Sequence, residues 1–345
     1  MAEGRTLPAA DLQPLSTFGL PARADQVLII EHPDQLERLP DAVGPELILG
    51  GGSNTIFLGD FRGRILLSRL RGLAFEDLPG TDQVRVRAAA GESWHGLVRR
   101  CLDQGLHGIE NLALIPGSVG AAPIQNIGAY GVELDQVFES LTAWDRLQRR
   151  WVDLDRNDCA FAYRDSRFKS DEPGRFFITE VRLSLSRRFN PSLSYASLRD
   201  ALAARGIERP TPRQLIAMIL RLRRHRLPDP ARLANSGSFF KNPIVSAEQA
   251  VQALQRWPNL PHWPLPNQQI KLAAGAMIEH LGFKGKRLGG VGVYANHALV
   301  LVHHGGASGN QLQDLIERIQ HAVTEAFGVI LEPEPLLIGS LAKND

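Results

Sequence analysis

Residues 110–133, ENLALIPGSVGAAPIQNIGAYGVE, carry no charged side chain between Glu110 and Glu133, in a chain that is 22% charged. A membrane-spanning helix would need about 20 mostly apolar residues. Two prolines and four glycines would break such a helix, and Gln125 and Asn126 would leave polar groups in hydrocarbon. Composition alone leaves two hypotheses open, which are a long buried loop and a backbone cradle for a charged ligand.

The composition is that of an ordinary globular chain, and 345 residues are enough for two or three domains. Lys and Arg number 39 against 37 Asp and Glu, so the charge balance does not demand nucleic acid or an anionic membrane. The N-terminal residues lack the apolar run of a signal peptide, which predicts a cytoplasmic protein. Cys101 and Cys159 are expected to be buried thiols. No metal site is expected, since His303 and His304 are neighbours on a predicted strand and point to opposite faces.

Periodicity and capping residues predict a mixed α and β chain. Residues 26–39 read as a strand and a short helix, residues 46–58 as strand, glycine turn and strand, and residues 83–91 as a half-buried strand. Capping and stop residues predict helices over 93–105, 211–226, 246–257 and 308–328. Pro-rich residues 256–268 are expected to form a turn-laden surface excursion.

Three glycine-rich turns suggest an anion site. The first, LGGGSN at residues 49–54, follows a predicted strand and presents consecutive backbone amides, which suit anionic oxygens. It does not open a helix, because SNTIFL continues as a strand, and this pattern disfavours a Rossmann nucleotide site. PGSVGAAP and QNIGAYG supply further amides. Gln125 and Asn126 either read the edge of a flavin or purine or satisfy the loop's own backbone.

Three further segments place polar residues among aromatics and turn formers. FAYRDSRFK holds Arg164, NSGSFFKNP holds Ser238, and LEPEPLLIG holds Glu332 and Glu334. Each has an ordinary alternative, namely a surface ion pair, a turn and solvated carboxylates.

The chain resembles the UDP-N-acetylenolpyruvoylglucosamine reductase (MurB) family from about residue 15 to 340. The matching motifs, in family order, are TFG, LGGGSN, ENLALIPGSVGAAPIQNIGAYGVE, YRDSRFK, LPDP, GSFFKNP, KLAAG and LEPEP. The resemblance implies an α+β chain with two FAD-binding subdomains of the vanillyl-alcohol-oxidase (PCMH) type, at residues 1–72 and 73–220, the second with an extra tyrosine loop. It implies an α/β substrate-binding domain at residues 221–345.

The resemblance also implies an activity. NADPH would reduce non-covalent FAD, and the flavin would reduce UDP-N-acetylglucosamine enolpyruvate to UDP-N-acetylmuramate for peptidoglycan, in a protein expected to be a monomer. The family's catalytic residues fall on Arg164, Ser238 and Glu334. The expected FAD contacts are Gly50, Gly51, Gly52, Ser53, Asn54, Ile115, Pro116, Gly117, Ser118, Gly120, Ala121, Ile124, Gln125, Asn126, Gly128, Ala129 and Tyr130. The expected substrate contacts are Tyr163, Tyr195, Arg226, Lys241, Asn242, Lys271 and His297.

The chemistry assigns a role to each catalytic residue. Hydride addition to an enolpyruvyl group leaves negative charge that spreads into the carboxylate, so Arg164 would stabilise it. Ser238 would deliver a proton to the carbanionic carbon. Glu334 would be protonated or would orient a cation. Arg226 stands where the family has lysine, which keeps the charge and changes the hydrogen-bond geometry. His297, a lone histidine entering a strand, has packing in the core as its alternative role.

Two rival functions were weighed. The first is a flavin oxidase on the same scaffold, with FAD held covalently through His107 or Cys101. The second is a nucleic-acid binder, suggested by the cations of RLRRHR at residues 221–226. No stacking aromatics interleave with these cations, and cations suit a helix C-terminus, so the second rival is disfavoured.

Overall fold

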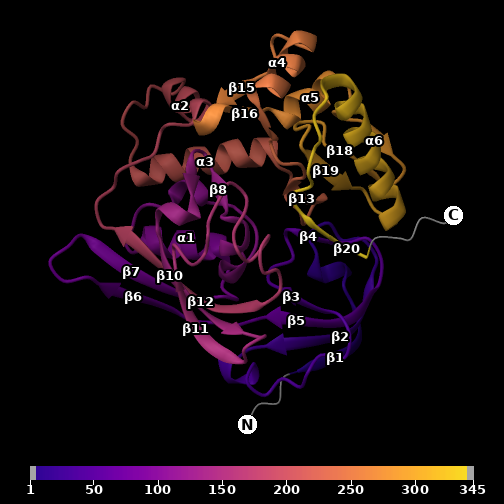
Figure 1. Cartoon of the computed structure of the whole chain (residues 1–345). Coiled ribbons are helices and arrows are strands. Elements are labelled where there is room, and N and C mark those ends of the chain that lie inside the picture. Colours follow the sequence, from indigo (N-terminus) through magenta and orange to yellow (C-terminus); the bar gives the residue numbers. More distant parts are fainter. Residues whose placement is uncertain (1–4, 340–345) are drawn as a thin grey trace. The chain divides into compact units, whose positions relative to one another are not determined.

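The computed structural model describes residues 5–339, which form two compact units (Figure 1). The first unit contains residues 5–10, 24–51 and 62–223, and the second contains residues 11–23, 52–61 and 224–339. Each unit has its own cluster of buried apolar side chains. The three-part division expected from the sequence remains a prediction, and the mixed α and β class is confirmed.

The first unit contains a four-stranded sheet and a five-stranded sheet, besides a two-stranded hairpin at residues 128–133. The four-stranded sheet has the strand order β1-β2-β5-β3, in which β3 and β5 are parallel and Leu49 lies opposite Leu67. The larger is antiparallel, with the order β11-β10-β12-β7-β6. The strands are β1 (Thr6–Asp11), β2 (Arg23–Ile30), β3 (Glu46–Leu49), β5 (Phe61–Ser68), β6 (Leu73–Asp77), β7 (Gln83–Ala89), β10 (Phe138–Asp145), β11 (Arg150–Asp155) and β12 (Phe176–Ser186).

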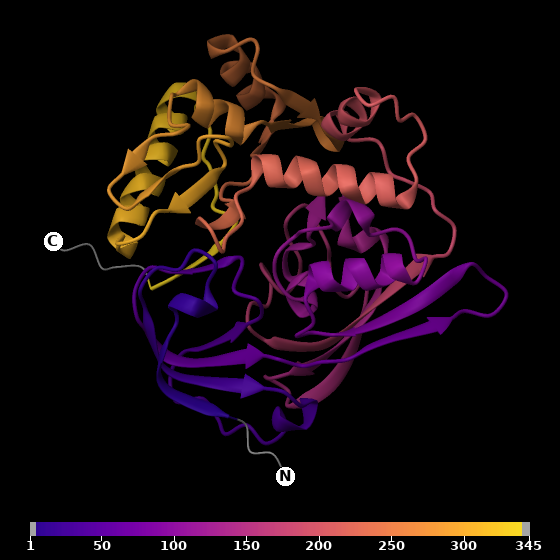
Figure 2. The same ribbon diagram turned by 180° about the vertical axis from the view of Figure 1, so that it is seen from behind.

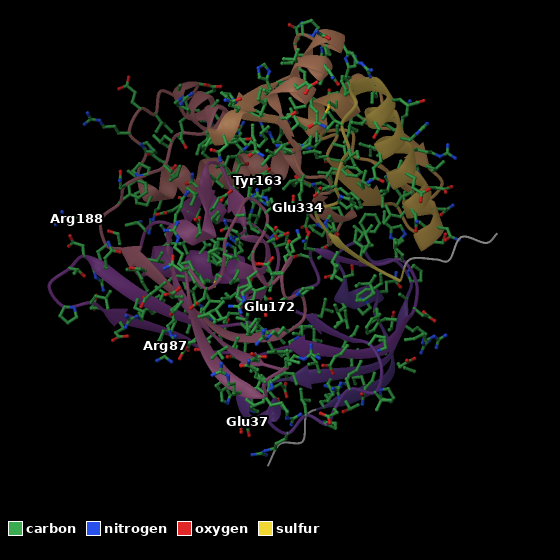
Figure 3. All side chains as sticks on the ribbon, viewed as in Figure 1. Glu37, Arg87, Tyr163, Glu172, Arg188 and Glu334 are labelled. Carbon is green, nitrogen blue, oxygen red and sulfur yellow. The ribbon has the colours of Figure 1, made fainter. Side chains whose placement is uncertain are left out.

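The larger sheet has one apolar and one charged face, because side chains alternate along each strand. Val181 of β12 pairs with Ala88 of β7, and both are buried. Arg182 pairs with Arg87, which is labelled in Figure 3, on the other face, where like charges repel. The carboxylate of Glu180 lies 3.0 Å from both guanidinium groups and offsets this repulsion.

Three helices complete the first unit, and α1 lies between the larger sheet and α3 in both views (Figures 1 and 2). They are α1 (Trp94–Asp103), α2 (Ala196–Ala203) and α3 (Pro212–Arg226), whose last three residues cluster with the second unit. The predicted caps are confirmed, since Ser93 accepts from the Gly96 amide and Thr211 exchanges hydrogen bonds with Gln214. Gly105, just beyond α1, has φ +66°, as a helix stop requires.

The second unit contains a four-stranded antiparallel sheet, β13-β19-β18-β17, a three-stranded sheet, β14-β16-β15, and a parallel pair, β4 and β20. Its strands are β4 (Thr55–Phe57), β13 (Ala234–Ser238), β14 (Ile244–Ser246), β15 (His262–Pro264), β16 (Gln269–Leu272), β17 (Arg287–Leu288), β18 (Val291–Val293), β19 (Val300–His303) and β20 (Leu336–Ile338). Its helices are α4 (Ala247–Arg256), α5 (Ala274–His280) and α6 (Gly309–Phe327).

Helix α6 has the boundaries and the buried face that its sequence predicts. Ser308 and Gln311 form a capping box, and Gly328 ends the helix with φ +69°. The buried stripe includes Leu312, Leu315, Ile316, Ile319, Val323 and Phe327. Burial of one such leucine contributes roughly 2 kcal/mol. No helix of residues 5–339 is long and apolar enough to cross a bilayer.

Two local predictions are confirmed with a difference in detail. The short helix expected before residue 39 is a single 3₁₀ turn, Pro33–Gln35, whose Gln35 side chain accepts from the amides of Glu31 and His32 in a capping box. The Pro-rich excursion is mostly exposed, as expected, and also contains an ordered strand, β15, which pairs with β16. Each proline there lacks an amide hydrogen, but β15 lies at the edge of its sheet, where one unpaired side is tolerated.

Candidate functional site

Two of the glycine turns pack against each other in the first unit. A Cβ at Gly51 would lie 2.7 Å from the Cα of Gly117, and one at Gly50 would overlap the Oγ of Ser118. Gly117 has φ +113°, a conformation that L side chains rarely adopt. The glycines are therefore required for close approach of two backbones, beyond what a simple turn needs.

This junction of the two turns leaves hydrogen-bond donors available. The Oγ of Ser118 is buried without a partner among residues 5–339. Within the same residues, the amides of Gly117 and Ser118 donate to no other group. A buried donor without a partner costs about 1–3 kcal/mol, and oriented amides favour anionic oxygens. The junction therefore fits a phosphate group such as those of FAD.

The remaining expected cofactor contacts are divided between the two units. In the first unit, Ile115, Ile124 and Ala129 are half-buried against the core, and the small size of Gly120 admits the neighbouring Ala90. In the second unit, Gly52 has φ +65°, and Asn54 donates through Nδ2 to the Glu334 carbonyl over 3.2 Å. The other members lie at the surface or half-buried and are Ser53, Pro116, Ala121 and Gln125.

The third glycine turn forms a tight hairpin of two short strands, β8 (Gly128–Ala129) and β9 (Val132–Glu133). Its two central residues, Tyr130 and Gly131, have φ +49° and +80°, which is the pattern of a type I′ turn. Glycine suits the second position because it has no Cβ to strain. The hairpin places Gly128 directly opposite Glu133.

Asn126 anchors this hairpin from within. Its Nδ2 donates to Glu133 Oε2 over 3.1 Å and to the Ala162 carbonyl over 3.2 Å, and its Oδ1 accepts from the Asp135 amide over 3.0 Å. Both amide hydrogens are thus used by the chain. Satisfaction of the loop's own polar groups, one of the two roles left open by the sequence, is observed, and the contact with a cofactor remains a prediction.

Arg164 lies against the same hairpin. Its backbone has φ +55°, uncommon for a residue with a side chain and frequent at functional sites. Its Nη2 donates to the Gly128 carbonyl over 2.7 Å, and its Nη1 lies 3.8 Å from Glu133 Oε1. The guanidinium also lies 5.1 Å from the ring centre of Tyr163, labelled in Figure 3. The cation is therefore held in one orientation.

Ser238 and Glu334 are brought together in the second unit. The Glu334 amide donates to the carbonyl of Phe239, the residue after Ser238, over 2.7 Å. An extra residue bulges β13 against β19 between Asn235 and Ser238, where Gly237 has φ +73°. Among residues 5–339, no group forms a hydrogen bond with the Ser238 hydroxyl. It is therefore available to a ligand. Arg164 belongs to the other unit.

The expected substrate residues of the first unit are aromatic. Tyr195 is half exposed before α2, and its ring meets the buried ring of Tyr130 edge-on at a centroid distance of 5.4 Å. Asn111 links the two segments, since its Nδ2 donates to the carbonyls of Tyr130 and Ser192. The tyrosine segment is thus attached to the hairpin that holds Arg164.

The expected substrate residues of the second unit occupy three places. Lys241 pairs with Glu332 over 3.1 Å, and Asn242 accepts from the Ala274 amide at the start of α5. Lys271 lies 6.0 Å from the ring centre of Trp263. Each of these polar groups has a partner inside the unit.

His297 accepts through Nδ1 from the Leu299 amide over 3.2 Å, so its Nε2 carries the proton. Burial, followed by the charges of Arg226 and Lys284, lowers the pKa of His297 below its ordinary value. The imidazole is therefore neutral near pH 7 and presents one N–H donor. Arg226, the last residue of α3, lies near enough to contribute to this shift.

Two charged residues at this site were missed by the sequence analysis. Glu133 ends the charge-free run and turns back onto Arg164. Arg223 of α3 has a buried Nε without a partner among residues 5–339. Burial lowers the pKa of Arg223, and the charge of Arg164 lowers it further, whereas Tyr130 raises it. In the sequence, Glu133 is marked only by its position at the end of the uncharged stretch, and Arg223 only by its position among the cations that end a helix.

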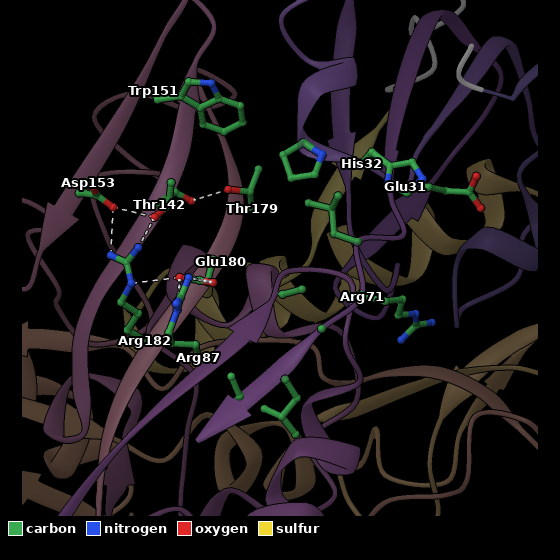
Figure 4. A pocket seen from close by; sticks show the side chains of 16 residues that line it. Glu31, His32, Arg71, Arg87, Thr142, Trp151, Asp153, Thr179, Glu180 and Arg182 are labelled. Carbon is green, nitrogen blue, oxygen red and sulfur yellow. Dashed lines mark hydrogen bonds and ion pairs between the residues drawn. The ribbon is translucent and has the colours of Figure 1, made fainter. Parts of the chain in front are cut away.

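An open hollow of about 730 Å³ lies elsewhere on the first unit (Figure 4). None of the expected site residues lines it. Its charged groups neutralise one another, because Arg182 binds Asp153 and Thr142, and Glu180 binds Arg182 and Arg87. This hollow has the character of a solvated sheet face.

Comparisons with known proteins identify the family of this chain. Residues 26–147 match a family model described as an FAD binding domain, and residues 229–338 match the C-terminal domain of UDP-N-acetylenolpyruvoylglucosamine reductase. A reductase of that name from Pseudomonas aeruginosa is 47% identical over 94% of this chain and 97% of its own. A reductase of the same name from Chromobacterium violaceum is 44% identical over 95% of this chain and 97% of its own. Another from Ralstonia nicotianae is 50% identical over 85% of this chain and 86% of its own.

A solved reductase from Thermus caldophilus shares the fold, with a TM-score of 0.65 and 24% identity over 98% of this chain and 99% of its own. The chain belongs to the UDP-N-acetylenolpyruvoylglucosamine reductase (MurB) family of FAD-dependent oxidoreductases.

Proposed function

We propose that the chain uses NADPH to reduce UDP-N-acetylglucosamine enolpyruvate to UDP-N-acetylmuramate. The relatives that are 44–50% identical carry the reductase name, which supports this substrate. The structural observation that carries the proposal is the backbone pairing of the Ser238 segment with the Glu334 segment, next to a serine hydroxyl that makes no hydrogen bond within residues 5–339. The product would serve peptidoglycan synthesis in the cytoplasm, and the protein would act as a monomer.

The junction of Gly50, Gly51, Gly117 and Ser118 would hold the phosphates of FAD, which would supply hydride transfer from NADPH to the terminal carbon of the enolpyruvyl double bond. Arg164 would meet the substrate carboxylate, into which the negative charge spreads. The Ser238 hydroxyl would give its proton to the adjacent carbon, which completes the lactyl ether. Glu334, held by its own backbone amide, would orient a cation or donate a hydrogen bond at the same place.

The residues present fit a flavin that is not covalently bound. Burial raises the pKa of the Cys101 thiol to about 12, which keeps it protonated and unreactive. His107 holds Glu110 at 2.7 Å, so one of its ring nitrogens is already engaged. Acid precipitation should therefore release the yellow chromophore into the supernatant. A coloured pellet would support the rival flavin oxidase.

Ser238→Ala tests the proton-transfer role. Flavin bleaching by NADPH should stay near the wild-type rate, because that half-reaction does not need the hydroxyl. Reoxidation by the enolpyruvyl nucleotide, followed anaerobically by stopped flow, should slow by about 10²–10⁴-fold. The matched control is Ser236→Ala on the same strand, which should leave both rates unchanged. Equal losses in both half-reactions of Ser238→Ala would remove the serine from this role.

A further inference from the structure

We propose that Glu133 is a positioning residue that fixes the guanidinium of Arg164 for the substrate carboxylate. This inference rests on the proposed function. Glu133 and Gly128 are paired across the β8–β9 hairpin, and each holds a different nitrogen of Arg164. The Gly128 carbonyl accepts from Nη2 at 2.7 Å, and the Glu133 carboxylate faces Nη1 at 3.8 Å.

The carboxylate of Glu133 is itself fixed. Its Oε2 accepts from Nδ2 of Asn126, whose side chain is 1% exposed and also binds the Ala162 and Asp135 backbones. The Glu133 carboxylate is therefore held by a hydrogen bond from a buried side-chain amide. A carboxylate with a locked orientation transmits that orientation to the cation beside it.

Arg164 needs such support for a physical reason. Its backbone is in the left-handed region, and its segment between Ala162 and Asp165 is a tight isolated bridge. A guanidinium presents five N–H donors in a planar fork. The hairpin contacts both terminal nitrogens of this fork and so fixes the plane of the guanidinium. A ligand carboxylate then meets preorganised donors, which is the condition for charge stabilisation without reorganisation.

A purely structural role for Glu133 makes a different prediction. Glu133→Gln has nearly the same size and keeps an oxygen for Asn126, so it preserves the hairpin and removes only the charge. If Glu133 served the hairpin alone, this variant would react like wild type. If it positions Arg164, reoxidation of the reduced flavin by substrate should slow roughly 10- to 100-fold, and reduction by NADPH should not change.

The decisive experiment is a double-mutant cycle with Arg164→Ala, measured as anaerobic flavin reoxidation at saturating substrate. In the Arg164→Ala background, Glu133→Gln should have less than about a twofold effect, because its partner is gone. Glu139→Gln is the matched control, since Glu139 is another half-exposed carboxylate of the first unit paired with an arginine, Arg85. It should match wild type.

The outcomes separate the two proposals. Wild type that is bleached by NADPH but not reoxidised by the enolpyruvyl nucleotide overturns the proposed function, and this inference with it. Active wild type with an unaffected Glu133→Gln, or with additive effects in the cycle, overturns the role of Glu133 alone. Glu133→Asp, which keeps the charge on a shorter side chain, should fall between wild type and Glu133→Gln. A Glu133→Asp protein whose flavin is reoxidised more slowly than that of Glu133→Gln would also overturn the positioning role of Glu133.

Discussion

Gly128→Ala tests whether space at one Cα sets the position of Arg164. A Cβ there would lie 2.7 Å from the Arg164 Nη1, 2.9 Å from the Cγ of Glu133 and 3.1 Å from the Val132 carbonyl oxygen. Ordinary contact begins at 3.4 Å, so Nη1 must retreat from 2.7 to 3.4 Å, or 0.7 Å. The atom that moves most easily is the far end of the arginine, so the cost falls on its orientation.

The expected magnitude follows from this displacement. Misplacement of a reacting group by about 1 Å costs about 10²-fold in rate, so a retreat of 0.7 Å predicts a loss of roughly 30-fold in flavin reoxidation by substrate. Stability should not fall by a comparable amount. Gly128 has no positive φ, and the atom nearest to the new Cβ is the end of a flexible side chain, so the loss of stability should be small.

The assay combines urea unfolding, flavin content and both half-reactions. Gly128→Ala should unfold within about 1 kcal/mol of wild type and reduce its flavin normally when FAD is saturating. Gly96→Ala in α1, where the new Cβ meets Ser93 no closer than 3.3 Å, is the matched control and should leave the rates unchanged. A Gly128→Ala protein that is fully loaded and reoxidised at the wild-type rate would refute the steric argument.

Three further outcomes are expected. Gly309→Ala at the start of α6 should destabilise by about 1–3 kcal/mol in urea unfolding, despite the better helix propensity of alanine, because its Cβ would overlap the Leu58 carbonyl. Cys101 and Cys159 should resist an aromatic disulfide reagent until the protein unfolds, because burial raises the pKa of each thiol to about 12; rapid labelling of native protein would contradict this. Burial lowers the pKa of His297 in the folded protein. Its contribution to stability is therefore complete above about pH 6.5, the ordinary histidine pKa in the unfolded chain. This contribution is lost as the pH falls towards the folded-state pKa, because the unfolded chain binds more protons in that range. His297→Gln should therefore flatten the acid side of the stability profile, and an unchanged slope would contradict the assignment.

Much of the local structure was predictable because its causes lie within a few residues. The boundaries of α6 follow from the Ser308 cap and the Gly328 stop, and its buried stripe follows from helical periodicity. The short helix after β2 is limited to a 3₁₀ turn, Pro33–Gln35, which Gln35 caps through the amides of Glu31 and His32. Arg164, Ser238 and Glu334 became candidate catalytic residues only when the family resemblance connected their motifs. Their catalytic roles remain predictions.

The sequence by itself determined the periodic helices, the glycine turns and the uncharged stretch, since caps, stops and steric freedom act over four or five positions. Only the tertiary structure decided that β4 pairs in parallel with β20, so that Asn54 donates to the Glu334 carbonyl across 280 positions of sequence. It also decided that Glu133 faces Arg164 and not solvent. Such contacts depend on how distant segments bury their apolar faces together, and no local pattern specifies which carboxylate then lies beside which cation.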